Sequence, residues 1–234
     1  MRRAAAATLL ALAGCTGGSG CTWAPAPTTA LQQPEAATGW TSKAGVEARR
    51  HVVVAAHPLA AEAGLQMLRE GGSALDAAIA AQMVLALVEP QSSGIGGGAL
   101  LMHFDGRKPG AVQAWDGRET APAAARENLF LRPDGRPVPF DEAVIGGRAV
   151  ATPGVVKMLE AAHRVHGVLP WARLFVPAIT LAAQGFPLGP RLHMLLDVDA
   201  ALRRDALARA YFYRPDGRPH PVGHVLRNPA LAAL

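Results

Sequence analysis

The side chain best suited to binding a ligand in this sequence is Arg118, which lies in the string 116–122 (DGRETAP). A planar guanidinium can hold a carboxylate through two parallel hydrogen bonds, which fixes the orientation of the carboxylate as well as adding binding energy. Acidic residues stand close by at 116 and 119, so a surface ion pair is the second interpretation. The residues alone leave both interpretations open.

A glycine-rich stretch precedes Arg118. Residues 92–98 (SSGIGGG) include four glycines in five positions, and chains keep glycine where φ must be positive or where a backbone or a ligand comes close. The spacing at 94–99 matches the dinucleotide fingerprint G-x-G-x-x-A, but that motif follows a strand and opens a helix. Here the predicted order is helix, loop, strand. Close packing of backbone on backbone therefore explains these glycines better than a bound nucleotide does.

Two other kinds of site are less well supported by the residues. His163 and His166 lie three apart on a predicted helix and could share a metal ion, but two histidines are too few for a tetrahedral site. Ser92 and Ser93 lack the G-x-S-x-G elbow of serine hydrolases, and no Asp and His partners can be assigned to them. We expect neither a metal site nor a serine triad.

The elements that must position Arg118 follow from periodicity and turn residues. Before it we predict a buried strand at 52–56, a helix from Leu59 to Gly71, a buried apolar helix from Ser73 to Val88, and a hairpin of strands at 99–104 and 111–115. Ser73 and Asp76 have the form of a capping box. Arg118 then lies just beyond the second strand of the hairpin.

After Arg118 the pattern is mainly helical. We predict helices at 155–166, 171–184 and 192–210, and the first turns of another at 229–234. The hexamer RPDGRP occurs at 132–137 and again at 214–219. A true repeat would extend over a whole supersecondary unit, so we interpret both copies as tight Asp-Gly turns.

The composition is that of a globular protein with one sizeable core, because half of the 234 residues are apolar and 18% are charged. The net charge of +5 is scattered along the chain and aromatic residues make up only 5%. Nucleic-acid binding needs clustered basic residues and stacking aromatics, so we predict no nucleic-acid partner.

The N-terminus has the features of an export signal. Two arginines precede an apolar run at 4–13, and the segment 12–15 (LAGC) resembles the bacterial lipobox, in which the cysteine is lipidated. We predict a signal peptide at 1–14, a lipid anchor on Cys15, a flexible tether over 15–45 and a domain from 46 to 234. The protein would then be exported and held at a bacterial membrane, in the periplasm or at the cell surface. A disulfide between Cys15 and Cys21, or two free thiols, is the alternative.

The strings SSGIGGG, DGRETAPAAA and GVLPWARLFVPAITLAAQGFPL resemble the N-terminal part of the large subunit in the gamma-glutamyltranspeptidase (glutathione hydrolase) family. The resemblance begins near His51 and continues to Leu234. It implies an α/β (α+β) fold, the α/β/β/α sandwich of N-terminal-nucleophile hydrolases, of which this chain would hold the N-terminal portion. It also implies that Arg118 binds the α-carboxylate of a γ-glutamyl substrate such as glutathione.

The same resemblance implies a precursor that cleaves itself and leaves a threonine nucleophile at the start of a small subunit, with no metal or organic cofactor. Family members run to more than twice this length, so we expect no catalytic residue in this chain and no activity from the chain alone. Two alternatives remain: a short lipoprotein that only binds or scaffolds, and a relative that acts on poly-γ-glutamate or cephalosporin side chains. The apolar helix predicted at 77–88 argues against the first, because this helix and half of the sandwich would lack covering strands and would expose apolar surface.

Overall fold

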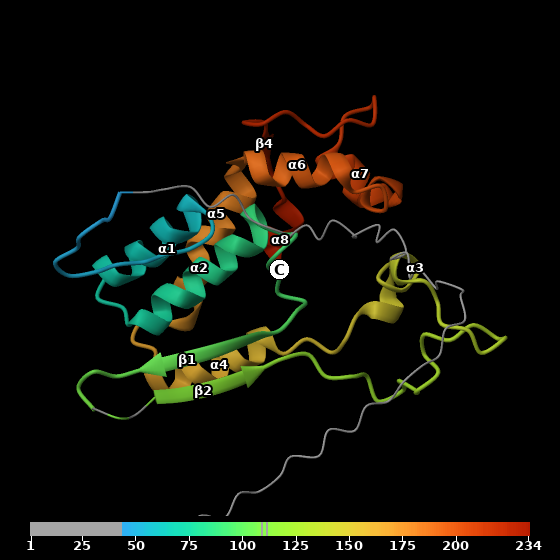
Figure 1. Cartoon of the computed structure of the whole chain (residues 1–234). Coiled ribbons are helices and arrows are strands. Elements are labelled where there is room, and N and C mark those ends of the chain that lie inside the picture. Colours follow the sequence, from blue (N-terminus) through green and yellow to red (C-terminus); the bar gives the residue numbers. More distant parts are fainter. Residues whose placement is uncertain (1–43, 109, 111) are drawn as a thin grey trace, which may run out of the picture. The chain divides into compact units, whose positions relative to one another are not determined.

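The computed structural model describes residues 44–108, 110 and 112–234 (Figure 1). The predicted signal peptide, the lipidation site Cys15 and nearly all of the predicted tether lie outside these residues. Within the described part of the chain, no helix has the length and apolar character needed to cross a lipid bilayer.

Two helices, α1 (Pro58–Arg69) and α2 (Ala74–Val88), pack directly on each other. The predicted apolar face of α1 is buried through Ala60, Ala63, Gly64 and Met67. At Gly64 a Cβ atom would lie 2.9 Å from the carbonyl oxygen of Ala77, which is closer than real Cβ atoms come. Glycine at this position therefore lets the two helices approach closely.

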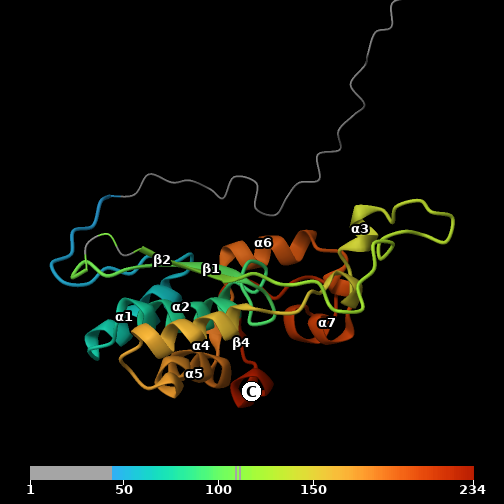
Figure 2. The same cartoon turned by 90° about the horizontal axis from the view of Figure 1, so that it is seen from below.

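The predicted capping box at the start of α2 is confirmed. The Ser73 hydroxyl accepts a 3.1 Å hydrogen bond from the Asp76 backbone N–H, and the Asp76 carboxylate accepts one of 2.7 Å from the Ser73 N–H. Figure 2 shows α2 between α1, α4 (Val155–His166) and α5 (Val176–Gln184), all of which contact it. Because neighbours cover several faces, the predicted burial of this apolar helix is also confirmed.

The predicted hairpin is formed by β1 (Ala99–Phe104) and β2 (Val112–Gly117), which pair antiparallel with Leu101 opposite Trp115. Both of these side chains pack against the core. On the other face, the side chains at 100, 102 and 104 are 61–75% exposed. Because β2 ends at Gly117, Arg118 is the first residue after the strand, as predicted.

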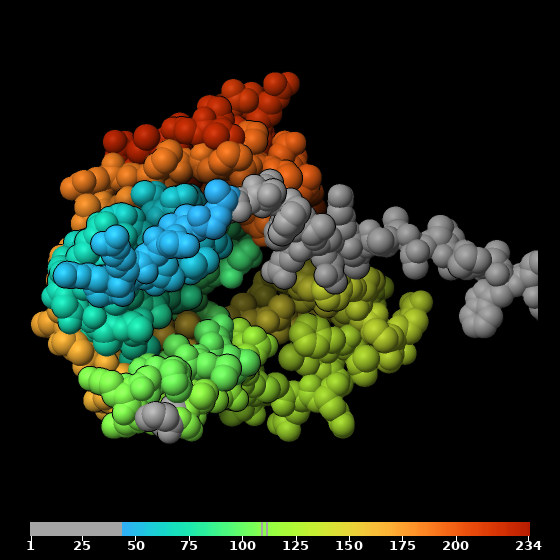
Figure 3. Space-filling view, turned by 60° about the vertical axis from the view of Figure 1, so that its left-hand side comes forward, coloured from blue at the N-terminus to red at the C-terminus, as the bar shows by residue number. Residues whose placement is uncertain are grey.

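The predicted strand at 52–56 is wrong. No strand or isolated bridge of the described residues includes this segment, and Val54 is 91% exposed. Val53 does pack on the core, against Gly64 of α1. In Figure 3 the blue residues before α1 lie along the teal helices. A run of β-branched residues forms a strand only beside a partner strand, and here its neighbours are helices.

The helix predicted at 171–184 is divided into a 3₁₀ turn, η2 (Trp171–Phe175), and α5. Pro177 explains the division, since it has no N–H to donate to the carbonyl of Arg173. Instead the Val176 N–H donates to that carbonyl, which gives the tighter 3₁₀ pattern.

The helix predicted at 192–210 is also divided, into α6 (Pro190–Val198), η3 (Leu202–Arg204) and α7 (Ala206–Phe212). Two aspartates cap the new starts. Asp199 accepts a 2.8 Å bond from the Leu202 N–H, and Asp205 accepts one of 2.8 Å from the Ala208 N–H. Short polar side chains that bond to nearby backbone compete with helix continuation.

The helix predicted at 155–166 is confirmed over its full length, but Val165, predicted on its buried face, is 61% exposed. In the last turn His166, not Val165, faces the hairpin, where it stacks on His103 and contacts the Gln113 side chain.

Both RPDGRP turns are confirmed, with Gly135 at φ 79° and Gly217 at φ 78°. In each turn the first and last arginine are joined by a 2.8 Å backbone hydrogen bond. The remaining elements are α3 (Phe140–Ala143), η1 (Gly147–Ala149), the pair β3 (Phe186–Pro187) and β4 (Val225–Leu226), and α8 (Pro229–Ala233). The helix predicted at 229–234 is thus confirmed.

Acidification is expected to weaken α1 through its N-cap. His57 caps this helix because its Nδ1 atom accepts a 3.2 Å hydrogen bond from the Leu59 N–H, which requires a neutral ring. Burial lowers the pKa of His57, and Glu89 raises it by a smaller amount. The folded pKa is therefore below the unfolded one of about 6.5, so stability is lost as the pH falls through this range.

We predict that urea denaturation gives a lower free energy of unfolding near about pH 5.5 than near about pH 7.5. The variant His57→Asn should make that difference smaller, because asparagine caps helices well and does not titrate. If His57→Asn keeps the full pH dependence, the cap is not its source.

Candidate functional site

The glycine loop, residues 92–98, connects α2 to the hairpin and also holds the start of α4. The carbonyl oxygen of Gly97 accepts hydrogen bonds of 3.1 and 3.2 Å from the backbone N–H groups of Gly154 and Val155. These donors belong to the first turn of α4, where N–H groups have no partner within the helix. Ser93 ties the loop to α2, since its hydroxyl accepts a 2.7 Å bond from the side chain of Gln82.

The end of β2 is joined to the same assembly. Thr120 and Thr152 pair through backbone hydrogen bonds of 3.3 and 2.9 Å. At Gly154 a Cβ atom would lie 2.5 Å from the carbonyl oxygen of Gly117, so no other residue fits there without displacing the strand end. The backbone that carries Arg118 is therefore fixed between the glycine loop and α4.

Arg118 itself is oriented by both acidic neighbours. Its backbone N–H donates a 2.9 Å bond to the carboxylate of Asp116, and its guanidinium lies 3.3 Å from Oε2 of Glu119. The side chain is 65% exposed. A guanidinium has five N–H donors, so this single contact leaves donors that face solvent and can receive a second carboxylate.

Glu119 connects Arg118 to the glycine loop. Its side chain is 25% exposed, and a Cβ atom added to Gly98 would lie 2.3 Å from its Oε2 atom. That oxygen is buried and accepts no hydrogen bond from the described residues. The sequence predicts this acid only as a possible surface ion-pair partner of Arg118. The signal that could have identified it is the glycine at 98, where a larger side chain would overlap the glutamate.

The predicted packing of backbone on backbone is confirmed only in part at Gly98, because the nearest atoms belong to the Glu119 side chain and the backbone nitrogen of Glu119 comes after them. This contact gives a matched test. We predict that Gly98→Ala lowers the free energy of unfolding by roughly 1–3 kcal/mol, because the new methyl group displaces the Glu119 side chain and also lies 2.8 Å from its backbone nitrogen. Gly96→Ala should change stability by less than about 0.5 kcal/mol, since its Cβ would meet nothing within 4 Å. Urea denaturation of both variants measures the difference, and equal effects would refute the packing explanation.

A cavity adjoins the glycine loop. It has a volume of about 640 Å³ and lies between α2, α4, η2, α5 and α8. No charged side chain lines it among the described residues, and Arg118 is not part of its wall. An amino-acid head group carries two charges, which cannot be buried there without partners. The surface at Arg118, rather than this cavity, is the candidate site for a carboxylate.

The two histidines considered as metal ligands have separate partners. Nε2 of His163 lies 2.9 Å from the carbonyl oxygen of Leu169 and 3.4 Å from the carboxylate of Asp76. His166 stacks on His103 with ring centres 3.9 Å apart. Among residues 44–108, 110 and 112–234, no three histidine, cysteine or acidic side chains are grouped as a metal site would require.

Comparisons with known proteins all find similarity to members of one family. The family model described as "Gamma-glutamyltranspeptidase" matches residues 60–234. The chain is 40% identical over 182 residues to the glutathione hydrolase proenzyme of Bacillus subtilis (strain 168), which covers 77% of this chain and 30% of that protein.

Solved structures show the same similarity. The gamma-glutamyltranspeptidase of Helicobacter pylori superposes with a TM-score of 0.75 at 31% identity, over 81% of this chain and 54% of that one. The transpeptidase CapD of Bacillus anthracis gives a TM-score of 0.61 at 33% identity, over 78% and 55%. The chain thus spans less than a third of the curated relative and about half of these structures.

Proposed function

We propose a function from one premise, which is that this chain belongs to the gamma-glutamyltranspeptidase family. The predicted fold class, that of the N-terminal-nucleophile hydrolases with mixed helix and sheet, is confirmed by the same similarities. On this premise the chain is the part of a γ-glutamyl transferase or hydrolase that binds the glutamyl head group of substrates such as glutathione.

The observation that carries this proposal is the placement of Arg118. Its guanidinium lies just after the end of β2 on a side chain that is 65% exposed, 3.3 Å from Glu119, which in turn lies against Gly98 of the glycine loop. A guanidinium can hold a carboxylate through two parallel hydrogen bonds, which gives the contact a defined geometry. The α-carboxylate of a γ-glutamyl group is such a ligand, and it would leave the γ-amide free for reaction.

The reaction requires a nucleophile and a base, which we propose lie on a small subunit cut from the same precursor. A threonine hydroxyl would attack the γ-carbonyl carbon while the threonine's own α-amine takes its proton. The C–N bond of the amide breaks, and the departing amine receives that proton. Water or a second amine then attacks the acyl ester and releases the enzyme.

The experiment uses γ-glutamyl-p-nitroanilide, whose cleavage releases coloured p-nitroaniline. Residues 1–234 purified alone should release none above the uncatalysed rate, whereas a precursor that continues past this chain into a segment starting with threonine should release it after processing. Release of p-nitroaniline by residues 1–234 alone would refute the proposal that the nucleophile lies on the small subunit. No release by the processed protein would refute the proposed γ-glutamyl activity.

We also propose that the protein is exported and anchored by a lipid on Cys15. The lipobox-like string at 12–15 supports this proposal. An acyl chain on Cys15 would hold the protein at a membrane, because each buried methylene contributes about 0.8 kcal/mol of binding free energy. Labelled fatty acid fed to expressing bacteria should enter the protein, and Cys15→Ala should abolish the label while Cys21→Ala keeps it. Labelling that survives Cys15→Ala would overturn the assignment.

A further inference from the structure

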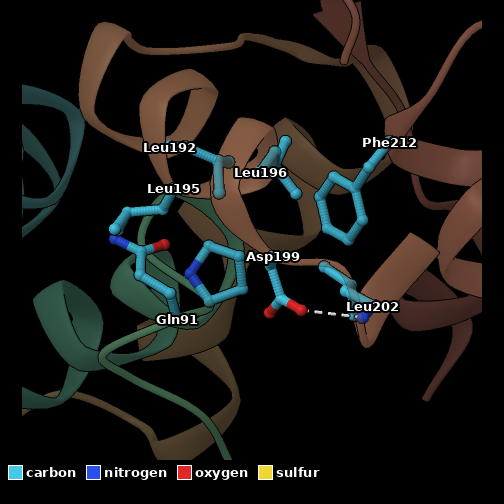
Figure 4. Close-up of a pocket in the computed structure, with 8 residues that line it drawn as sticks. Gln91, Leu192, Leu195, Leu196, Asp199, Leu202 and Phe212 are labelled. Carbon is cyan, nitrogen blue, oxygen red and sulfur yellow. Dashed lines mark hydrogen bonds between the residues drawn. The ribbon is translucent and has the colours of Figure 1, made fainter. Parts of the chain in front are cut away.

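A second, smaller pocket lies away from Arg118, where the chain after α2 meets the α6 to α7 region (Figure 4). It has a volume of about 200 Å³. Its apolar wall consists of leucines at 192, 195, 196 and 202 together with Phe212. Pro90, Gln91 and Asp199 complete the lining. The pocket is open to solvent, because Pro90 and Asp199 are exposed.

The polar groups of this pocket are hydrogen-bond acceptors. The amide nitrogen of Gln91 donates to the carboxylate of Glu89, which is 5% exposed and also lies 3.4 Å from the guanidinium of Arg191. This contact fixes the orientation of the amide. Figure 4 shows the Gln91 oxygen on the side of the pocket, and this buried oxygen accepts no hydrogen bond from the described residues.

Asp199 supplies the second acceptor at the mouth of the pocket. One of its oxygens accepts the 2.8 Å bond from the Leu202 N–H, drawn as a dashed line in Figure 4. That bond holds the carboxylate at the rim and leaves the other oxygen available. A wall of leucine and phenylalanine therefore ends in one carboxylate and one amide oxygen. Among the described residues that line the pocket, Gln91 has the one donor side chain, and its amide nitrogen donates to Glu89.

Size and charge together define the ligand. An apolar cavity of about 150 Å³ is large enough to take a six-carbon ring, so this pocket can hold a body of that size. A buried acceptor without a donor is unfavourable, and a carboxylate at the mouth attracts a cation. We propose that this pocket binds a small organic ammonium ion, with its hydrocarbon body among the leucines and its N–H groups toward Gln91 and Asp199.

The test uses three probes with the same hydrocarbon body: cyclohexylammonium, cyclohexanol and cyclohexanecarboxylate. Each is titrated into residues 1–234 with leucine methyl groups labelled for NMR, and the pocket methyls at 192, 195, 196 and 202 report binding. We expect cyclohexylammonium to bind with a dissociation constant of roughly 1 mM. Cyclohexanol should bind about threefold to fivefold more weakly, since an exposed ion pair contributes up to about 1 kcal/mol, which is about fivefold in affinity. The carboxylate should not bind.

Two variants separate the charge from the apolar wall. Asp199→Asn keeps an oxygen that can accept from the Leu202 N–H, so the fold is retained, and it should abolish the preference for the ammonium over the alcohol. Asp197→Asn removes a neighbouring carboxylate that pairs with Arg203 outside the pocket and should leave the preference intact. Equal affinity for all three probes, no saturable shift of the pocket methyls, or a preference that survives Asp199→Asn would each overturn the proposal.

Discussion

Replacing Arg118 with alanine is expected to lower kcat/KM for γ-glutamyl-p-nitroanilide by roughly 100-fold to 1,000-fold in the processed enzyme that contains this chain. The reason is that the substrate's α-carboxylate then loses its only proposed cation within this chain. Removing one partner of a hydrogen-bonded charge pair costs about 2–5 kcal/mol where the pair is buried, as we propose for Arg118 with substrate bound in the processed enzyme, and much of that cost comes from the charge left unpaired. Steady-state kinetics of the wild type and the variant measure the ratio.

Two further variants distinguish orientation from charge. Arg118→Lys keeps the positive charge but loses the paired N–H geometry, so we expect it to recover only part of the activity, with a loss of about tenfold or more. Arg107→Ala removes an exposed arginine near the turn of the same hairpin, where it pairs with Asp105, and should leave kcat/KM unchanged. If Arg118→Ala were as active as Arg107→Ala, Arg118 would be only a surface ion pair.

Replacing Asp76 with alanine is expected to lower the free energy of unfolding by roughly 3–5 kcal/mol, the largest stability effect in the described domain. This fully buried carboxylate accepts three backbone hydrogen bonds on one oxygen, of 2.7 Å from Ser73, 3.0 Å from Val168 and 3.1 Å from Leu169. It therefore joins the start of α2 to the loop after α4. Alanine would leave these donors without a partner, at about 1–3 kcal/mol each if none finds water.

Partial replacements should separate the contributions of Asp76. In Asp76→Asn the amide oxygen can accept hydrogen bonds from the same three N–H groups. The free energy of unfolding should then fall by only about 1–2 kcal/mol, which is the difference between a charged and a neutral acceptor. Ser73→Ala removes only one bond of the capping box and should cost about 1 kcal/mol. Urea denaturation of the three variants gives the order, and an Asp76→Ala effect no larger than that of Ser73→Ala would show that the contacts to 168 and 169 do not hold the loop.

The sequence predicted the elements whose causes are local. The capping box at 73–76, the Asp-Gly turns at 132–137 and 214–219, and the hairpin all depend on residues within a few positions of each other. The two divided helices were missed although their causes, Pro177 and Asp199, are also local. The apolar periodicity at 171–184 and 192–210 predicts continuous helices, but the missing N–H of proline and the capping preference of aspartate interrupt them.

Contacts between distant segments could not be predicted in the same way. The second role of Asp76 joins residues more than ninety positions apart, and nothing in the local pattern at 73–76 indicates it. The segment 52–56 has the composition of a strand, but its state depends on what lies beside it. At the candidate site, Arg118 was found from its own chemistry and a resemblance, whereas the contact of Glu119 with Gly98 required the fold.

We propose that Arg118, which pairs with Glu119 beside the glycine loop, binds the α-carboxylate of the γ-glutamyl group. The most direct test compares wild type and Arg118→Ala on γ-glutamyl-p-nitroanilide and on 4-aminobutyryl-p-nitroanilide, which lacks only that carboxylate. We predict a large loss of kcat/KM on the first substrate. On the second substrate the loss should be less than about threefold, because that substrate has no carboxylate for Arg118 to bind. An equal loss on both substrates would contradict the claim.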